Sequence, residues 1–176
     1  LECFGDLFPL TAGANLVENC LNSPNILTHL SGTLLNLGGI EQKKENFALF
    51  TDGINDAYIR CLELLEEERS KVLKALEMEW YAAPVRPFMN MLKERGTHPE
   101  LEAFRNLSGP DGLNHRYITE DAGCGVALLV SLAEKCGVEV PVTEALLTLA
   151  SRLTGKDYRR TGRTWEWLGN DAMDSC

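Results

Sequence analysis

The feature that most restricts the fold is an apolar run at residues 120–136, where charged side chains occur only at the two ends. Those charges are Glu120, Asp121, Glu134 and Lys135. A helix that is apolar on every side is stable only when protein surrounds most of it. At about 1.5 Å per residue this helix would span about 25 Å, the width of a small domain. We therefore predict an all-α, bundle-like fold with one long, buried central helix.

Prolines, glycines and capping residues divide the rest of the chain into shorter helices. Ser23-Pro24 fits an N-cap followed by a first helical residue, and Gly38-Gly39 fits a left-handed C-cap. Thr119 is expected to cap the central helix. The predicted helices cover residues 25–37, 56–78, 84–95, 99–107, 120–136, 141–155 and 164–168, and residues 46–50 are expected to be extended.

The predicted helix at 56–78 is amphipathic. Ile59, Leu62 and Leu65 begin an apolar series at helical spacing, while Glu63 and Glu66 are expected to face solvent. This helix should therefore pack on the core by one face only.

Length and charge limit the domain count and the class of partner. The 176 residues fit a single domain, 1–176. A net charge of −9 makes the chain a poor candidate for binding nucleic acid or anionic membrane, because both need a positive protein surface. No apolar run reaches the about 18 residues that suggest a membrane-spanning helix. The basic stretch 152–163 is expected to be a solvated face, with anion binding as the alternative.

The six cysteines are scattered, and no two of them form a C-x-x-C pair. Such spacing is typical of reduced thiols in an intracellular protein, so a cytoplasmic location is expected. No signal-peptide pattern opens the chain. The first residue, Leu1, suggests a fragment or a processed product, and the sequence leaves a homodimer open.

Several catalytic and binding motifs do not occur in the sequence. There is no G-x-G-x-x-G and no G-x-x-x-x-G-K-[ST], so no phosphate-binding loop is visible and any cofactor-binding residues stay unknown. His29, His98 and His115 lack the spacing of metal ligands, and no metal is expected. No G-x-S-x-G motif indicates a serine hydrolase.

His29 is the first candidate for chemistry. It lies early in a predicted helix whose other side chains are mostly apolar. A single histidine in that setting is more often a hydrogen-bonded core residue than a catalyst. Because histidine exchanges a proton near neutral pH, an acid/base role stays open.

A second candidate is the segment N-H-R-Y-I-T-E-D at residues 114–121. It places Arg116 just before the predicted central helix, with Glu120 and Asp121 in the expected first turn. Favourable interaction with the helix dipole explains acidic residues there without any function. An ionised carboxylate would also suit a histidine that needs an orienting partner.

Several segments together resemble the helical C-terminal domain of the octopine/nopaline (opine) dehydrogenase family, from about residue 7 to 169. The most specific are N-I-L-T-H at 25–29 and R-Y-I-T-E-D at 116–121. The others, in chain order, are L-L-N-L-G at 34–38, Ile40-Glu41, Glu68-Arg69, Gly109-Pro110, Gly137-Val138 with Pro141, and Gly162-Arg163-Thr164.

The resemblance implies a bundle of the 6-phosphogluconate dehydrogenase C-terminal type that acts beside an N-terminal Rossmann domain absent from this chain. Family members join an amino acid to a 2-oxo acid and reduce the imine with NAD(P)H, which the Rossmann domain holds. By the same resemblance, His29 matches the acid/base histidine and Asp121 its carboxylate partner. Arg116 matches the arginine that binds a substrate carboxylate, which a guanidinium can do bidentately. His115 is expected only to support the site.

The sequence departs from the family near the expected substrate cavity. Leu30-Ser31-Gly32 stands where a proline-containing turn is common, and Thr51 where an aromatic residue is common. These departures leave the substrate open.

Two other functions stay open. The first is a related reductase of 2-oxo acids, of the ketopantoate reductase or hydroxyacid dehydrogenase type, although those proteins typically use lysine where this chain has His29. The second is a non-catalytic helical binding or dimerisation module.

Overall fold

The computed structural model describes residues 13–169, which form an all-α fold without strands in that range. No helix in this part of the chain is long and apolar enough to cross a membrane. The α-helices are α1 (Leu16–Asn22), α2 (Asn25–Leu35), α3 (Leu37–Lys43), α4 (Leu49–Asp52), α5 (Asp56–Ala75), α6 (Val85–Lys93), α7 (Glu102–Arg105), α8 (Arg116–Glu120), α9 (Ala127–Cys136), α10 (Pro141–Thr154), α11 (Tyr158–Thr161) and α12 (Trp165–Leu168). Two 3-10 turns, η1 (Lys44–Asn46) and η2 (Pro99–Leu101), and a π-helical segment, η3 (Asp121–Val126), complete them.

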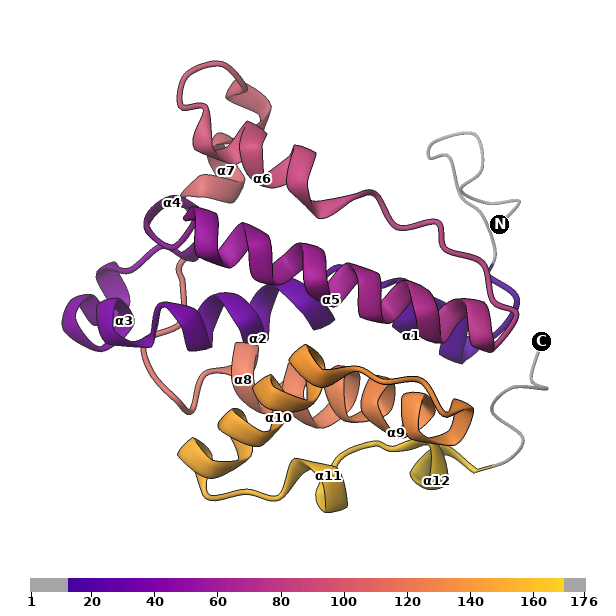
Figure 1. Ribbon diagram of the computed structural model, residues 1–176. Helices are drawn as coiled ribbons and strands as arrows, with labels where there is room; N and C mark the ends of the chain where they lie inside the picture. Colours follow the sequence, from indigo (N-terminus) through magenta and orange to yellow (C-terminus); the bar gives the residue numbers. More distant parts are fainter. Residues whose placement is uncertain (1–12, 170–176) are drawn as a thin grey trace, which may run out of the picture.

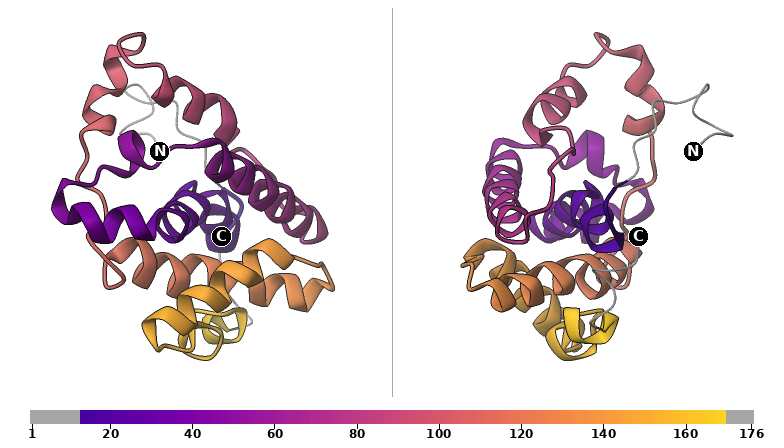
Figure 2. Two further views of the ribbon diagram at one scale, coloured as in Figure 1. Left: turned by 60° about the vertical axis from the view of Figure 1, so that its left-hand side comes forward. Right: turned by 90° about the vertical axis from the view of Figure 1, so that its right-hand side faces the viewer.

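Helices α2 and α5 lie against each other in the middle of the molecule (Figure 1). On one side they meet the run from α8 to α10, with α11 and α12 beyond it. At the opposite end α6 and α7 project from the bundle, as the turned views show (Figure 2). Two clusters of buried side chains fill the interior, one around α9 and one between α2, α5 and α6.

The predicted central helix is confirmed as a buried element. All residues from Gly125 to Ala133 are buried, and Leu129, Leu132 and Ala133 are fully so. Its predicted start was wrong, because the helical run begins at Arg116, four residues earlier than expected. His115 is the N-cap and accepts a hydrogen bond from the N–H of Tyr117 at 3.3 Å through Nδ1, so Thr119 lies inside the helix.

A π-turn separates α8 from α9. The N–H of Ala127 donates to the carbonyl of Ala122, five residues earlier, so the carbonyl of Gly123 loses its usual α-helical partner. That carbonyl accepts instead from the N–H of Arg163 at 2.7 Å. The loop comes this close because residue 162 is glycine: a Cβ there would lie 2.8 Å from the same carbonyl oxygen.

Two other sequence predictions were wrong. Gly38 and Gly39 do not end a helix but lie inside α3, because the break falls at Asn36 (φ −116°, ψ 11°). The Asn36 amide donates to the carbonyls of Gly32 and Gly53 at 2.8 and 3.0 Å and so stabilises the break. At 46–50, only Phe47 and Ala48 have extended backbone angles before α4 begins.

Most other predicted helix ends are confirmed within a few residues. Gly137 and Gly155 end α9 and α10 with φ of 66° and 69°, which glycine adopts at little cost. Ser23, by contrast, makes no side-chain cap to α2. Glu66 was expected to face solvent but is 8% exposed, because its carboxylate accepts the N–H of Val85 at 3.0 Å.

Substitution by alanine is expected to affect stability differently at the two glycines of η3. A Cβ on Gly125 would overlap Cγ2 of Ile26 in α2, whereas a Cβ on Gly123 would make ordinary contact with the Tyr158 ring at 3.6 Å. We expect Gly125→Ala to lower the free energy of unfolding by about 1–3 kcal/mol, as overpacking does. Gly123→Ala should leave it unchanged or raise it by up to about 1 kcal/mol. Urea unfolding of the two variants measures the difference, and equal values would contradict the close crossing.

Candidate active site

His29 and Asp121 meet at the crossing of α2 and η3. Nδ1 of His29 lies 3.1 Å from Oδ2 of Asp121, although 92 positions separate them in the sequence. Their side chains are 8% and 13% exposed, so the contact is largely shielded from water. The predicted approach of Asp121 to His29 is confirmed.

The local structure explains why these two side chains meet. Gly125 lets η3 pack directly on Ile26, which lies one turn before His29 on α2. One turn later, the hydroxyl of Thr33 donates to the carbonyl of His29 at 2.7 Å and adds a second hydrogen bond at that point of the helix. The contact between the backbone at Gly125 and the side chain of Ile26 therefore fixes the position of α2, and with it the imidazole, against η3.

The sequence predicted that Asp121 lies in the first turn of a helix, and this prediction was wrong. Asp121 follows the complete turn of α8 and begins the π-helical segment. The free N–H groups of a helix N-terminus therefore do not surround its carboxylate, and the close polar neighbour is His29. Single π-turns inside α-helices occur frequently at functional sites, where they redirect side chains.

Tyr117 is the part of the site that sequence reasoning missed. Its ring stacks on the His29 imidazole with centroids 3.7 Å apart and planes inclined by 10°. His115 meets the same ring edge-on at 4.7 Å, and the guanidinium of Arg116 lies 5.2 Å from its centre. The signal was available: Tyr117 precedes Asp121 by four residues, so both lie on one helical face.

Arg116 lies at the rim of this cluster. Its side chain is 59% exposed, and its ion-pair partner is Glu120, one turn later, at 3.7 Å. An exposed pair of this kind contributes at most about 1 kcal/mol and is easily exchanged for another anion. The guanidinium is therefore free to bind a carboxylate that arrives from solvent.

A cleft of about 460 Å³ opens beside Asp121. Glu120 and Asp121 line one wall, and Asn25, at the start of α2, lines another. Arg163 reaches the same cleft from the loop before α12, where its own N–H holds the carbonyl of Gly123. Acidic and basic side chains thus line the same cleft, whose volume suits a small substrate.

Burial shapes the ionisation of the aromatic groups in the cluster. It lowers the pKa of His115 from its ordinary value, and the nearby charges of Arg116 and His29 act in the same direction, while Asp111 opposes them. Burial also raises the pKa of Tyr117, so its hydroxyl stays protonated at neutral pH. His115 is thus disposed to be neutral in its capping role.

The other sequence features of interest lie away from this cluster. His98 contacts Glu94 and Glu100 at 3.7 and 3.1 Å near α7. In the basic stretch, Arg159 pairs with Glu134 and lies 3.6 Å from Glu144. Nothing in these contacts extends the candidate site.

Comparison with known proteins identifies the family of the chain. The sequence model of the family described as NAD/NADP octopine/nopaline dehydrogenase, alpha-helical domain, matches residues 12–154. The chain belongs to the octopine/nopaline dehydrogenase family. An opine dehydrogenase of Arthrobacter sp. (strain 1C) is 31% identical over 185 residues, which cover 100% of this chain and 50% of the relative.

Two less similar relatives match a shorter part of the chain. The protein ocs of Agrobacterium tumefaciens (strain Ach5) and the vitopine synthase of Allorhizobium ampelinum are each 26% identical, over 81% of this chain and 41% of their own length. The chain thus spans about half the length, or less, of these relatives. Two of the family-like segments, N-I-L-T-H and R-Y-I-T-E-D, meet at the contact between His29 and Asp121. A third, G-R-T, reaches the adjoining cleft through Arg163.

The pKa of His115 reports on this arrangement of charges. We expect its NMR titration midpoint to lie below the ordinary value of about 6.5, because burial disfavours the imidazolium. Arg116→Gln removes a repelling charge and should raise the midpoint, whereas Asp111→Asn removes an attracting one and should lower it further. A midpoint that stays unchanged in both variants would show that His115 lies away from these two charges.

Proposed function

We propose that this chain is the substrate-binding and acid/base domain of an NAD(P)-dependent opine dehydrogenase-like enzyme. In that reaction an amino acid and a 2-oxo acid condense to an imine, which is then reduced. The observation that carries the proposal is the shielded contact between His29 and Asp121, stacked on Tyr117 and next to Arg116. Membership of the octopine/nopaline dehydrogenase family supports it.

His29 is proposed to exchange the proton. An ionised Asp121 accepts the hydrogen on Nδ1, which leaves Nε2 as the nitrogen that faces the reaction. Asp121 would also stabilise the imidazolium that forms when Nε2 takes a proton. Such a pair can protonate the oxygen that leaves as water during imine formation, or take a proton from the attacking amino group.

Arg116 is proposed to bind a substrate carboxylate. Both substrates carry one, and a guanidinium binds it with two parallel hydrogen bonds. Because Arg116 and His29 both contact Tyr117, a substrate held by the first lies near the second. Holding two small molecules together in this way can lower the barrier by about 7–11 kcal/mol in favourable cases.

The cleft next to His29 and Asp121 does not fit the phosphates of a dinucleotide. The cleft beside Asp121 carries two carboxylates, which repel a pyrophosphate, and the sequence has no glycine-rich phosphate loop. The hydride is therefore proposed to come from NAD(P)H held by a Rossmann domain outside this chain. This chain's own residues would act only on the substrates and their protons.

The acid/base proposal predicts a specific pattern of turnover in the full-length protein. His29→Ala should lower kcat by about 10²–10⁴-fold, the usual effect of losing a positioned acid or base. Asp121→Asn should lower kcat as well, because an amide orients and stabilises the imidazolium less well. If the two residues act as one unit, the double variant should be little slower than His29→Ala alone.

Kinetics and melting temperatures of the three variants test this pattern. A core role for His29 predicts instead that activity falls only with the folded fraction and that the losses add. Additive losses that follow thermal stability would falsify the dyad. No NAD(P)H oxidation by the full-length protein with any common amino acid and 2-oxo acid would refute the function itself.

Arg116→Lys should raise the apparent KM for a carboxylate substrate by at least about 10-fold, since one charge-assisted hydrogen bond contributes about 1.5–3 kcal/mol. The melting temperature should hardly change, because the side chain is exposed. Arg60→Lys is a matched control, since Arg60 is 64% exposed and pairs with Glu63 on α5 at 3.6 Å. Equal KM values for both variants would give Arg116 a purely structural role.

A further inference from the structure

Another cavity, of about 390 Å³, shares the lining residue Asn25 with the cleft that contains Asp121. No charged side chain of the described part of the chain lines it. Its walls are apolar apart from the side chains of Asn22, Asn25 and Thr28. The size lies within the range of small-molecule sites, about 300–1,000 Å³.

Three phenylalanines from three separate elements form one wall of this cavity. Phe104 of α7 packs against Phe50 of α4 at 4.7 Å and against Phe88 of α6 at 5.4 Å, measured between ring centres. Phe104 is nevertheless 37% exposed. A large aromatic side chain that is packed on two rings yet open to solvent is well placed to contact a ligand.

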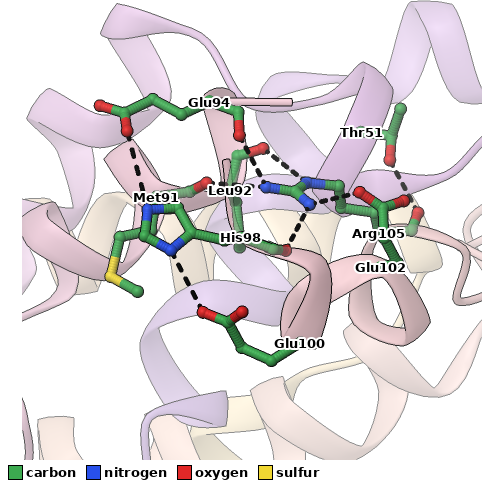
Figure 3. Close-up of polar contacts among 8 residues, drawn as sticks. All are labelled: Thr51, Met91, Leu92, Glu94, His98, Glu100, Glu102 and Arg105. Carbon is green, nitrogen blue, oxygen red and sulfur yellow. Dashed lines mark hydrogen bonds and ion pairs between the residues drawn. The ribbon is translucent and has the colours of Figure 1, made fainter. Parts of the chain in front are cut away.

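A buried arginine fixes the positions of these elements. Arg105, with a side chain 4% exposed, donates hydrogen bonds to the carbonyls of Met91, Leu92, Glu94 and His98 and pairs with Glu102 (Figure 3). Its own carbonyl accepts the hydroxyl of Thr51 at 2.7 Å. Arg105 follows Phe104 directly and contacts Thr51, which follows Phe50. It also binds the C-terminal end of α6, the helix that carries Phe88.

The cavity shares helix α2 with the proposed acid/base residue. Asn25 and Thr28 line it, and His29 follows Thr28 directly. Asn25 and His29 are four residues apart on one helical face, where Cβ atoms lie about 6 Å apart. An amino acid whose side chain entered the cavity would therefore keep its amino group within a short reach of His29.

We infer that this cavity binds the side chain of the amino-acid substrate and selects an apolar, uncharged one. The inference rests on the proposed function and names its substrate class. A cationic or anionic side chain would lose its hydration in the cavity and find no opposite charge among the lining residues. An aliphatic or aromatic side chain would instead replace water on the phenylalanine wall, which is favourable.

The test uses the full-length protein with pyruvate, NADH or NADPH, and a series of amino acids. We expect kcat/KM for leucine, methionine and phenylalanine to exceed that for arginine and glutamate by at least about 10-fold. Phe104→Glu places a carboxylate at the cavity wall and should raise the ratio of kcat/KM for arginine to that for leucine by at least about 10-fold. Leu107→Glu is the matched control, because Leu107 is 45% exposed, three residues away, and does not line the cavity.

A second variant keeps the test independent of an introduced charge. Phe88→Ala enlarges the cavity and should raise the ratio of kcat/KM for phenylalanine to that for valine. Oxidation of NAD(P)H with arginine or glutamate preferred would overturn the inference and leave the proposed function standing. Unchanged ratios in both cavity variants would do the same. No oxidation with any pair of substrates would overturn both.

Discussion

The close crossing of α2 and η3 is the contact on which the candidate site depends. Gly125 is the position at which any Cβ would overlap Ile26, so only glycine permits the two backbones to come this near. The π-turn at the same place frees the carbonyl of Gly123, and the loop at Gly162 and Arg163 binds it. The same short segment therefore lets α2 come close enough for His29 to contact Asp121 and anchors the loop that brings Arg163 to the neighbouring cleft.

Buried charges on α5 hold the rest of the bundle around this crossing. The carboxylate of Glu68 accepts the N–H groups of Val142 and Thr143 at 2.8 Å each, and so serves as the N-terminal cap of α10, whose preceding residue makes no side-chain cap. Arg69, fully buried, donates to the carbonyls of Leu21 and Ser23 at 3.2 Å, at the junction between α1 and α2. Burial lowers the pKa of Arg69, while Glu66 opposes that effect. Two of its nitrogens have no hydrogen-bond partner among the described residues, so this position is held at an energetic cost.

The sequence allowed the fold class to be predicted better than the site. Gly137, Pro141 and Gly155 identified their helix ends because the conformations they favour are local properties. Residue chemistry alone made His29 and Asp121 a candidate pair, and the family resemblance was needed to predict their contact, since no periodicity relates positions 92 residues apart. The π-turn was unpredictable for a different reason: it is stabilised by a tertiary hydrogen bond from Arg163. Burial of Glu66 was missed because its partner is the backbone N–H of Val85, which only the fold brings to it.

Helix α2 therefore has two proposed tasks on neighbouring residues. His29 contacts Asp121 of η3, its proposed acid/base partner, whereas Thr28 lines the apolar cavity and Asn25 lines both that cavity and the cleft beside Asp121. Thr28 is also held from the other side, because the hydroxyl of Tyr58 on α5 donates to its carbonyl at 2.7 Å in a fully buried contact. A rigid helix that carries both proposed functions keeps their spacing constant, so the phenylalanine wall can change without moving the imidazole.

Thr51, where the family commonly has an aromatic residue, belongs to the wall and not to the proposed acid/base pair. Its hydroxyl donates to the carbonyl of Arg105 and thereby helps to position the wall. In the proposed function, substrate choice would depend on α4, α6 and α7, which carry the phenylalanine wall, and proton transfer would depend on the crossing of α2 and η3 at Gly125.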